Sequence, residues 1–119
     1  MNIKLVNPTL QLKEKALEYR QEHFNSNEFV INGSEMLDKM KSYEEWLERI
    51  TRNKKAETVD PNWVVTDTFF ALRESDQKII GIIDFRHELK GVLKYLGNCG
   101  YSVRPSERRK GYATEMLKL

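Results

Sequence analysis

The sequence predicts a single α/β domain whose elements follow the order strand, helix, helix, three strands and helix. Its length of 119 residues suffices for one domain with a modest core and is short for two. Hydrophobic residues make up 39% of the chain and charged residues 32%, a balance typical of soluble globular proteins. Apolar residues recur at helical spacing in the first half, and strand-like patterns begin at Thr68.

The N-terminal elements are a short strand and a helix. Ile3 and Leu5 alternate with polar neighbours, so residues 2–6 are expected to form a strand that Pro8 closes. Residues 9–24 carry apolar side chains at helical spacing and are expected to form a helix. The polar residues 25–27 then end it.

A second helical region is expected to start at Ser34, a residue type that caps helices. Apolar residues follow at steps of three and four and predict one buried stripe: Met36, Met40, Tyr43, Leu47 and Ile50. Ser42 and Glu45 have the spacing of a capping box, so the helix can break and restart there. Residues 53–62 are polar, contain Pro61 and predict a loop inside the domain.

Strand patterns fill the second half of the chain. Residues 68–73 and 78–87 predict two strands joined by a turn. The continuous apolar run over residues 79–83 is typical of a central strand covered on both faces. Residues 88–96 indicate only a connection, and residues 98–103 predict another strand.

The last predicted element is a helix. Pro105 interrupts the preceding strand, and Ser106 or Glu107 is expected to open a helix that runs to Leu119. This helix has no C-cap glycine, and its apolar residues need a packing partner. We therefore expect the fold to be truncated after its third main helix. The open edge of residues 98–103 would be covered by a missing half or by a second copy, as in a homodimer.

Composition narrows the function classes. The formal net charge is only +2, from 20 basic and 18 acidic residues, which argues against a nucleic-acid partner. The single cysteine, Cys99, excludes an intramolecular disulfide and a cysteine-based zinc cluster, and no metal site is expected. The chain shows no signal peptide and no apolar run near the roughly 20 residues of a membrane span. A cytoplasmic protein without membrane partners is expected.

Residues 100–114 carry the strongest chemical signal. A strand runs into a turn and then into a helix, whose first backbone N–H groups lack intrahelical partners and can bind phosphate. Gly111 has no Cβ, so an anion can approach the main chain, and Ala113 keeps the next position small. A basic cluster adds positive charge, unless it is only a solvated helix start: Arg104, Arg108, Arg109 and Lys110.

This segment resembles a known motif. The run Arg108-x-x-Gly111-x-Ala113 resembles the acyl-CoA pyrophosphate loop of the GNAT N-acetyltransferases, and residues 101–105 resemble the end of that superfamily's fourth strand. The element order is similar to the first half of the GNAT fold. The resemblance implies a mixed, mostly antiparallel sheet flanked by helices on both faces. Residues 1–119 would form the N-terminal part of a single N-acetyltransferase domain.

The resemblance also implies acetyl-CoA as the acyl donor. The backbone of residues 109–114 would hold its pyrophosphate, and the strand end would align the pantetheine arm like an added strand. The acetyl group would pass directly to a primary amine in a ternary complex, without a covalent acyl-enzyme. The implied cofactor-binding residues are Tyr101, Ser102, Val103, Arg108, Arg109, Lys110, Gly111, Tyr112, Ala113 and Thr114.

Catalytic residues are less defined. Asp84 and His87 lie on the expected central strand and are candidates for a base, a proton relay or a substrate anchor, with a structural role open for both. Many GNAT members place a glutamate base on the fourth strand, but residues 98–103 contain no carboxylate. The tyrosine acid of many members would lie beyond Leu119. Cys99 is expected to be packed and non-catalytic.

Other interpretations stay open. The chain can be a GNAT-like domain that binds acyl-CoA without catalysis, or a nucleic-acid module built on the basic cluster. The acceptor is also open, since a small-molecule amine, a peptide N-terminus and a lysine side chain all fit the resemblance.

Overall fold

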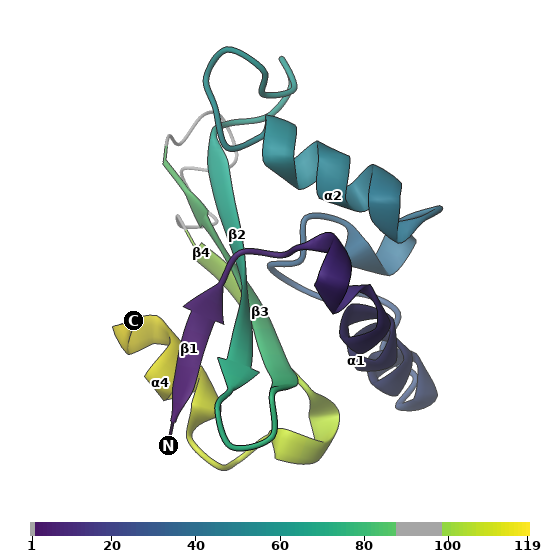
Figure 1. Ribbon diagram of the computed structural model, residues 1–119, viewed down its shortest axis with the longest axis vertical. Helices are drawn as coiled ribbons and strands as arrows, with labels where there is room; N and C mark the ends of the chain where they lie inside the picture. The colour runs from purple at the N-terminus through teal and green to yellow at the C-terminus, as the bar shows by residue number, and fades with distance from the viewer. Residues whose placement is uncertain (1, 88–98) are drawn as a thin grey trace.

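The computed structural model describes residues 2–87 and 99–119, which form an α/β fold around one antiparallel sheet (Figure 1). The sheet has the strand order β1-β2-β3-β4. Its strands are β1 (Ile3–Val6), β2 (Thr66–Arg73), β3 (Lys78–Arg86) and β4 (Cys99–Val103). The described strands pair antiparallel, which agrees with the expected α/β fold and its mostly antiparallel sheet.

Helices cover both faces of this sheet. One face packs against α1 (Lys13–Asn25), which follows a 3-10 turn at Leu10–Leu12, and against α2 (Tyr43–Arg52). The opposite face packs against α4 (Tyr112–Lys118). Figure 1 shows the two layers on either side of the strands. None of the described helices is long and apolar enough to cross a membrane.

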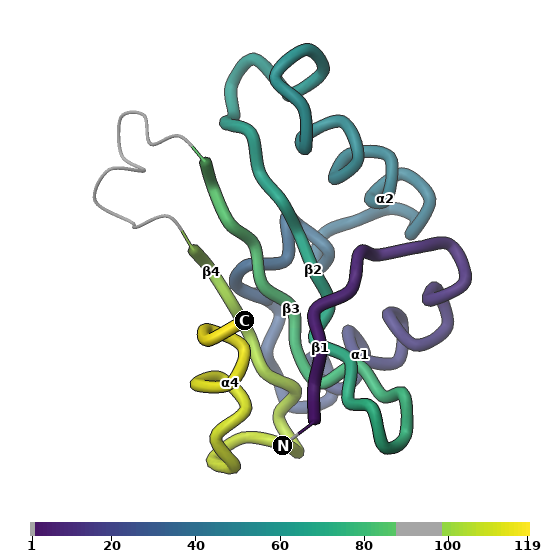
Figure 2. The backbone as a smooth tube through the Cα atoms, turned by 60° about the vertical axis from the view of Figure 1, so that its left-hand side comes forward, coloured from purple at the N-terminus to yellow at the C-terminus, as the bar shows by residue number. Residues whose placement is uncertain are grey.

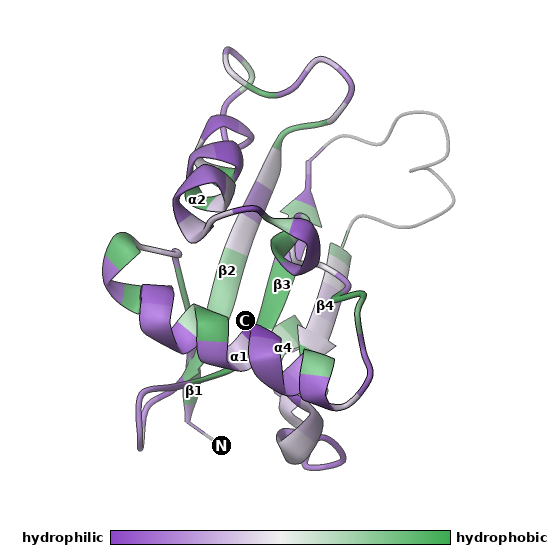
Figure 3. Cartoon of the chain, turned by 90° about the vertical axis from the view of Figure 1, so that its right-hand side faces the viewer, coloured by the Kyte–Doolittle hydropathy of each residue, from purple (hydrophilic) through white to green (hydrophobic). Residues whose placement is uncertain are grey.

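The strand β3 is central in the sheet, as its apolar run predicts. It pairs with β2 on one side and with β4 on the other, and the hydrophobic colour along it is visible in Figure 3. Ile79 and Ile82 belong to the core under α1 and α2, whereas Ile80 and Ile83 belong to the core under α4. All four side chains are fully buried. Side chains alternate between the two faces along β3, and a register shift opposite Ala71 and Leu72 leaves Ile80 without a pairing partner on β2 and resets the alternation, so one apolar strand supplies both cores.

The first part of the second helical region differs from the prediction. Glu35 and Met36 have positive φ angles of 51° and 70°, which interrupt a helix, and only a 3-10 turn forms at Leu37–Lys39. The break and restart at Ser42 is confirmed, because its side chain accepts a hydrogen bond from the backbone N–H of Glu45. The apolar stripe is therefore split between a turn and α2.

Two strand and helix boundaries also need correction. The strand β2 begins at Thr66, two residues before the expected start at Thr68. The final helix begins at Tyr112, not at Ser106, because Pro105–Glu107 forms only a 3-10 turn. The connection expected over residues 88–96 lies outside the described residues.

Candidate functional site

The loop between β4 and α4 adopts an irregular path after its 3-10 turn. Arg108 is extended, while Arg109 and Gly111 have positive φ angles of 64° and 89°. The first hydrogen bond inside α4 runs from the N–H of Glu115 to the carbonyl of Gly111. The amides of residues 112–114 therefore have no acceptor within the helix.

One side of this loop is fixed by α1 and the turn after it. The guanidinium of Arg108 donates to both carboxylate oxygens of Glu28, at 2.5 and 2.6 Å, and to the carbonyl of Val103 at 3.0 Å. These bonds from Arg108 hold the pKa of Glu28 at about 2. Glu28 also contacts Nδ1 of the buried His23 at 3.0 Å. The Arg108 side chain is thus bound within the protein.

Arg104 is part of the core, although the sequence groups it with the loop cations. It is fully buried and donates to both oxygens of Glu18 at 2.5 and 2.9 Å and to Glu22 at 3.0 Å. Its Nε donates to the carbonyl of Ile79 at 2.8 Å. Glu22 also accepts the backbone N–H of Ser106 at 2.8 Å. Arg104 therefore ties the end of β4 to α1 and is not available to a ligand.

The other side of the loop is fixed by Arg73 at the end of β2. Its guanidinium donates to Glu107 and to the hydroxyl of Tyr112, both at 3.0 Å. Lys110 donates to the same Glu107 carboxylate at 3.0 Å. Within residues 2–87 and 99–119, Arg109 is the loop cation that forms no ion pair. The positive charge of Arg109 is therefore the one most available to a ligand at the loop.

The strand β4 lies at one edge of the sheet (Figure 2), and its residues 101–103 face the loop just described. The side chain of Tyr101 is exposed, and Val103 belongs to the core under α4. The Ser102 hydroxyl donates to the carbonyl of Asn32 at 2.6 Å. Gly33 approaches β4 so closely that a Cβ there would lie 2.3 Å from the carbonyl carbon of Gly100. The segment after α1 therefore covers the start of β4.

The structure does not pair the two catalytic candidates with each other. Asp84 is buried on β3, where it accepts the N–H of Gly100 at 2.9 Å and a longer contact from Arg86 at 3.4 Å. Burial raises the pKa of Asp84. His87 follows β3, is half exposed, and its Nε2 lies 2.6 Å from the carboxylate of Asp67. Asp84 is thus next to β4, whereas His87 is held by β2.

Sequence reasoning missed Glu35. Its buried carboxyl accepts hydrogen bonds from Trp63 Nε1 at 3.1 Å and Asn53 Nδ2 at 3.2 Å, and it lines the same cavity as Asp84. Burial and the neighbouring charge of Asp84 raise the pKa of Glu35. Positions 35 and 84 are far apart in the chain, so the sequence does not predict that they lie close together. The positive φ of Glu35 is the backbone feature that turns its side chain inward, and no sequence pattern signals it.

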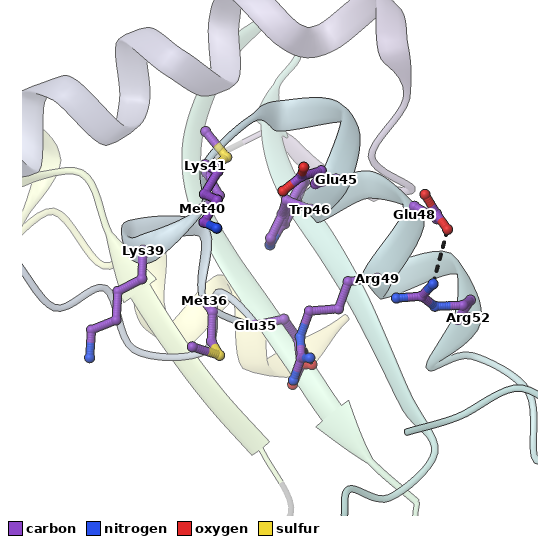
Figure 4. Close-up of a pocket in the computed structure, with 10 residues that line it drawn as sticks. All are labelled: Glu35, Met36, Lys39, Met40, Lys41, Glu45, Trp46, Glu48, Arg49 and Arg52. Carbon is purple, nitrogen blue, oxygen red and sulfur yellow. Dashed lines mark hydrogen bonds and ion pairs between the residues drawn. The ribbon is translucent and has the colours of Figure 1, made fainter. Parts of the chain in front are cut away.

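Two cavities meet at Glu35. A cavity of about 270 Å³ reaches Asp84 and is lined also by Gly33, Trp63 and Arg86. An adjoining cavity of about 400 Å³ lies between the 3-10 turn at Leu37–Lys39 and α2 (Figure 4). Glu35, Met36, Lys39 and Arg49 line both. Together they form a continuous recess that ends below the start of β4.

Comparison with known families decides the classification. A family model described as an acetyltransferase (GNAT) domain matches residues 8–119. The chain belongs to the GNAT acetyltransferase family. A search of curated proteins gave no match. The predicted resemblance is confirmed over nearly the whole length of the chain.

The loop of this GNAT chain has features that suit a phosphate-bearing ligand. Gly111 adopts a left-handed conformation that disfavours a side chain, three helix-start amides have no intrahelical acceptor, and Arg109 supplies an exposed cation. Membership of the family indicates acyl-CoA-dependent acetyltransferase activity in general. Ala113 packs against the core under α4, and Thr114 is exposed on the first turn.

Proposed function

We propose that the chain transfers an acetyl group from acetyl-CoA to a primary amine in a ternary complex. The observation that carries the proposal is the loop at residues 108–111, which is fixed on both sides and leaves the amides of residues 112–114 and Arg109 unpaired. A loop held in place before its ligand arrives loses little conformational freedom on binding. Its position directly after β4 agrees with the motif that resembles the GNAT acyl-CoA loop, and the chain belongs to that family.

Each part of the site has a proposed role. The amides of residues 112–114 and the Arg109 guanidinium bind the phosphates, while Arg108 and Lys110 keep the loop in shape. The backbone edge of Tyr101, Ser102 and Val103 aligns the pantetheine arm. Since a strand rises about 3.3 Å per residue, the arm passes about 10 Å along β4 to reach Gly100. Acetyl-CoA supplies an activated thioester there.

The chemistry at the start of β4 is direct acyl transfer. The uncharged amine nitrogen forms a bond to the acetyl carbon while the carbon–sulfur bond breaks, and the leaving thiolate takes up a proton. A base is needed, because an alkylamine is protonated at neutral pH. Asp84 is better placed for this role than His87, since its carboxylate contacts Gly100 of β4.

Calorimetric titration with acetyl-CoA tests the proposal. The unmodified chain should bind acetyl-CoA, and Gly111→Glu should weaken binding at least about tenfold, or about 1.4 kcal/mol, by placing a carboxylate near the phosphates. Gly111→Gln is the matched control, because it brings the same backbone strain without charge and should lose less affinity. The absence of heat at millimolar acetyl-CoA would refute the assignment, as would equal affinity of Gly111→Glu and the unmodified chain.

A further inference from the structure

Two carboxyl groups from distant parts of the chain meet beside β4. The side chains of Glu35 and Asp84 are only 2% and 4% exposed, and both line the same cavity of about 270 Å³, where the charge of Asp84 acts on Glu35. Two carboxyls in contact cannot both ionise at ordinary cost, so such a pair holds one proton between them. Burial raises the pKa of both groups, which favours a proton held on the pair.

The negative charge of this pair is only loosely compensated by its neighbours. The Arg86 guanidinium lies 3.4 Å from Asp84, and Arg49 lies 3.9 Å from Glu35 and equally far from Asp60. Charge-assisted hydrogen bonds between such groups are usually about 2.7–2.9 Å long. Within residues 2–87 and 99–119, the cations that pair with these two carboxyls do so at distances longer than usual, and a cationic ligand would add a closer one.

A second polar group on the same sheet face lacks a partner. Thr68 lies directly across from Asp84 in the β2–β3 ladder and is fully buried. Its hydroxyl has no hydrogen-bond partner in the part of the chain that the structure describes. Directly opposed residues on antiparallel strands share a face, so the Thr68 hydroxyl lies on the same face of the sheet as the Asp84 carboxyl, behind the residues that line the cavity. An ammonium group has three N–H donors, and the carboxyl oxygens of the pair can accept them.

The recess leading to the pair suits an aliphatic chain. Its outer cavity has Met36, Met40 and Trp46 among its lining residues, and Figure 4 shows Met36 and Met40 on the segment before α2, Trp46 on α2, and Glu35 beside Arg49. Charged side chains complete the lining: Lys39, Lys41, Arg49, Arg52, Glu45 and Glu48. Away from Glu35 and Arg49, three cations stand against two glutamates in this lining, a positive balance that disfavours a second ammonium group, so one amine on an apolar chain fits best.

We propose that Glu35 and Asp84 form a proton-sharing carboxyl pair that binds the ammonium group of a primary alkyl monoamine, whose carbon chain lies along Met36, Met40 and Trp46. The proposal rests on the proposed acetyl transfer, for which the pair supplies the base. The ammonium gives one proton to the pair, and the free amine then attacks the thioester. The amine's second proton goes to the leaving thiolate, and the pair releases its extra proton to water.

The position of the pair relative to β4 supports this role. Asp84 Oδ1 accepts the N–H of Gly100, so the pair lies at the end of β4 that the thioester would reach. Gly33, which lines the inner cavity, packs on Gly100 from the same side. An amine held by the pair is thus delivered to the first residues of β4.

Hexylamine is the probe for this site. Chemical-shift titration of the 119-residue chain should show hexylamine binding at residues 31–36 and 84, and 1-hexanol, which has no charge, binding at least about tenfold more weakly. Hexane-1,6-diamine should also bind more weakly than hexylamine. These comparisons use the unmodified chain. Hexanol binding as tightly as hexylamine, or absence of hexylamine shifts at these residues, would overturn the proposal, and tighter diamine binding would overturn the monoamine class.

Substitutions test whether Glu35 and Asp84 are the carboxyl groups that bind the ammonium group. Glu35→Gln and Asp84→Asn should each weaken hexylamine binding at least about tenfold and leave hexanol binding unchanged. Glu44→Gln, an exposed glutamate on the same helix as Trp46, should stay within about twofold of the unmodified chain. Unchanged hexylamine affinity in both carboxyl variants would contradict the assignment. Acetyl-CoA affinity is measured on the same samples. Hexylamine binding without acetyl-CoA binding would contradict the proposed function and leave the amine site standing.

Discussion

Arg108, Arg109 and Lys110 are neighbours in the chain, yet their side chains have different surroundings. Arg108 is bound by Glu28, Lys110 by Glu107, and Arg109 is exposed. The sequence shows three positive charges after a strand and predicts a site for anions. The sequence cannot show which of these cations forms an ion pair within the protein, because Glu28 is 80 positions away from Arg108.

Glu28→Gln tests the ion pair that holds Arg108. The folded state keeps the pKa of Glu28 at about 2, against an ordinary value of 4.5, because Arg108 donates to its carboxylate. The stabilisation is therefore present above pH 4.5 and is lost as the pH falls toward 2. We expect the variant to be about 1 kcal/mol less stable at neutral pH, with the difference shrinking over that range.

Thermal unfolding at a series of pH values measures this effect. Glu57→Gln is the control, because Glu57 is an exposed glutamate on the loop after α2, and its replacement should leave stability unchanged across the series. A Glu28→Gln difference that stays constant from neutral pH to pH 2 would show that the carboxylate charge is not what holds Arg108.

At the scale of elements, contacts with α1 decide where the last helix begins. Pro105 and the residues after it suit the first turn of a helix, which is why the sequence predicts a start at Ser106. Glu22 of α1 instead takes the N–H and the hydroxyl of Ser106, and Glu28 draws Arg108 into an extended conformation. Tertiary hydrogen bonds thus end the 3-10 turn, and the helix begins only at Tyr112.

Gly33→Ala tests the contact between the segment after α1 and the start of β4. Gly33 has a φ of 74°, and an added Cβ would lie 2.3 Å from the backbone of Gly100. Because backbone cannot move aside cheaply, we expect a loss of about 2–4 kcal/mol in the free energy of unfolding, measured by denaturant titration.

Asn27→Ala is the matched control for that variant. Asn27 has a φ of 61° but is exposed, so its replacement carries only the backbone cost of about 1 kcal/mol. Equal losses in the two variants would mean that the Gly33–Gly100 approach has no energetic role.

At the scale of the whole molecule, local patterns predict the order of elements and the central position of β3. The apolar run at residues 79–83 identifies this strand, because only a strand covered on both faces needs such a run. The loop that we propose to bind acyl-CoA can also be recognised in the sequence, since Gly111 and its basic neighbours are contiguous. The sequence does not predict the burial of Arg104 or the contact of Glu35 with Asp84. Each depends on partners that are 49 or more residues apart in the chain.

The most direct test of the account is an amide proton–nitrogen NMR titration of the chain with acetyl-CoA. The account predicts that the largest shifts fall on the amides of residues 109–114 and 101–103, with smaller changes at Gly100 and Asp84. Residues 53–62, on the loop after α2, should not respond. Shifts confined to other parts of the chain, or none at saturating acetyl-CoA, would contradict the claim that this loop and strand edge bind the acyl donor.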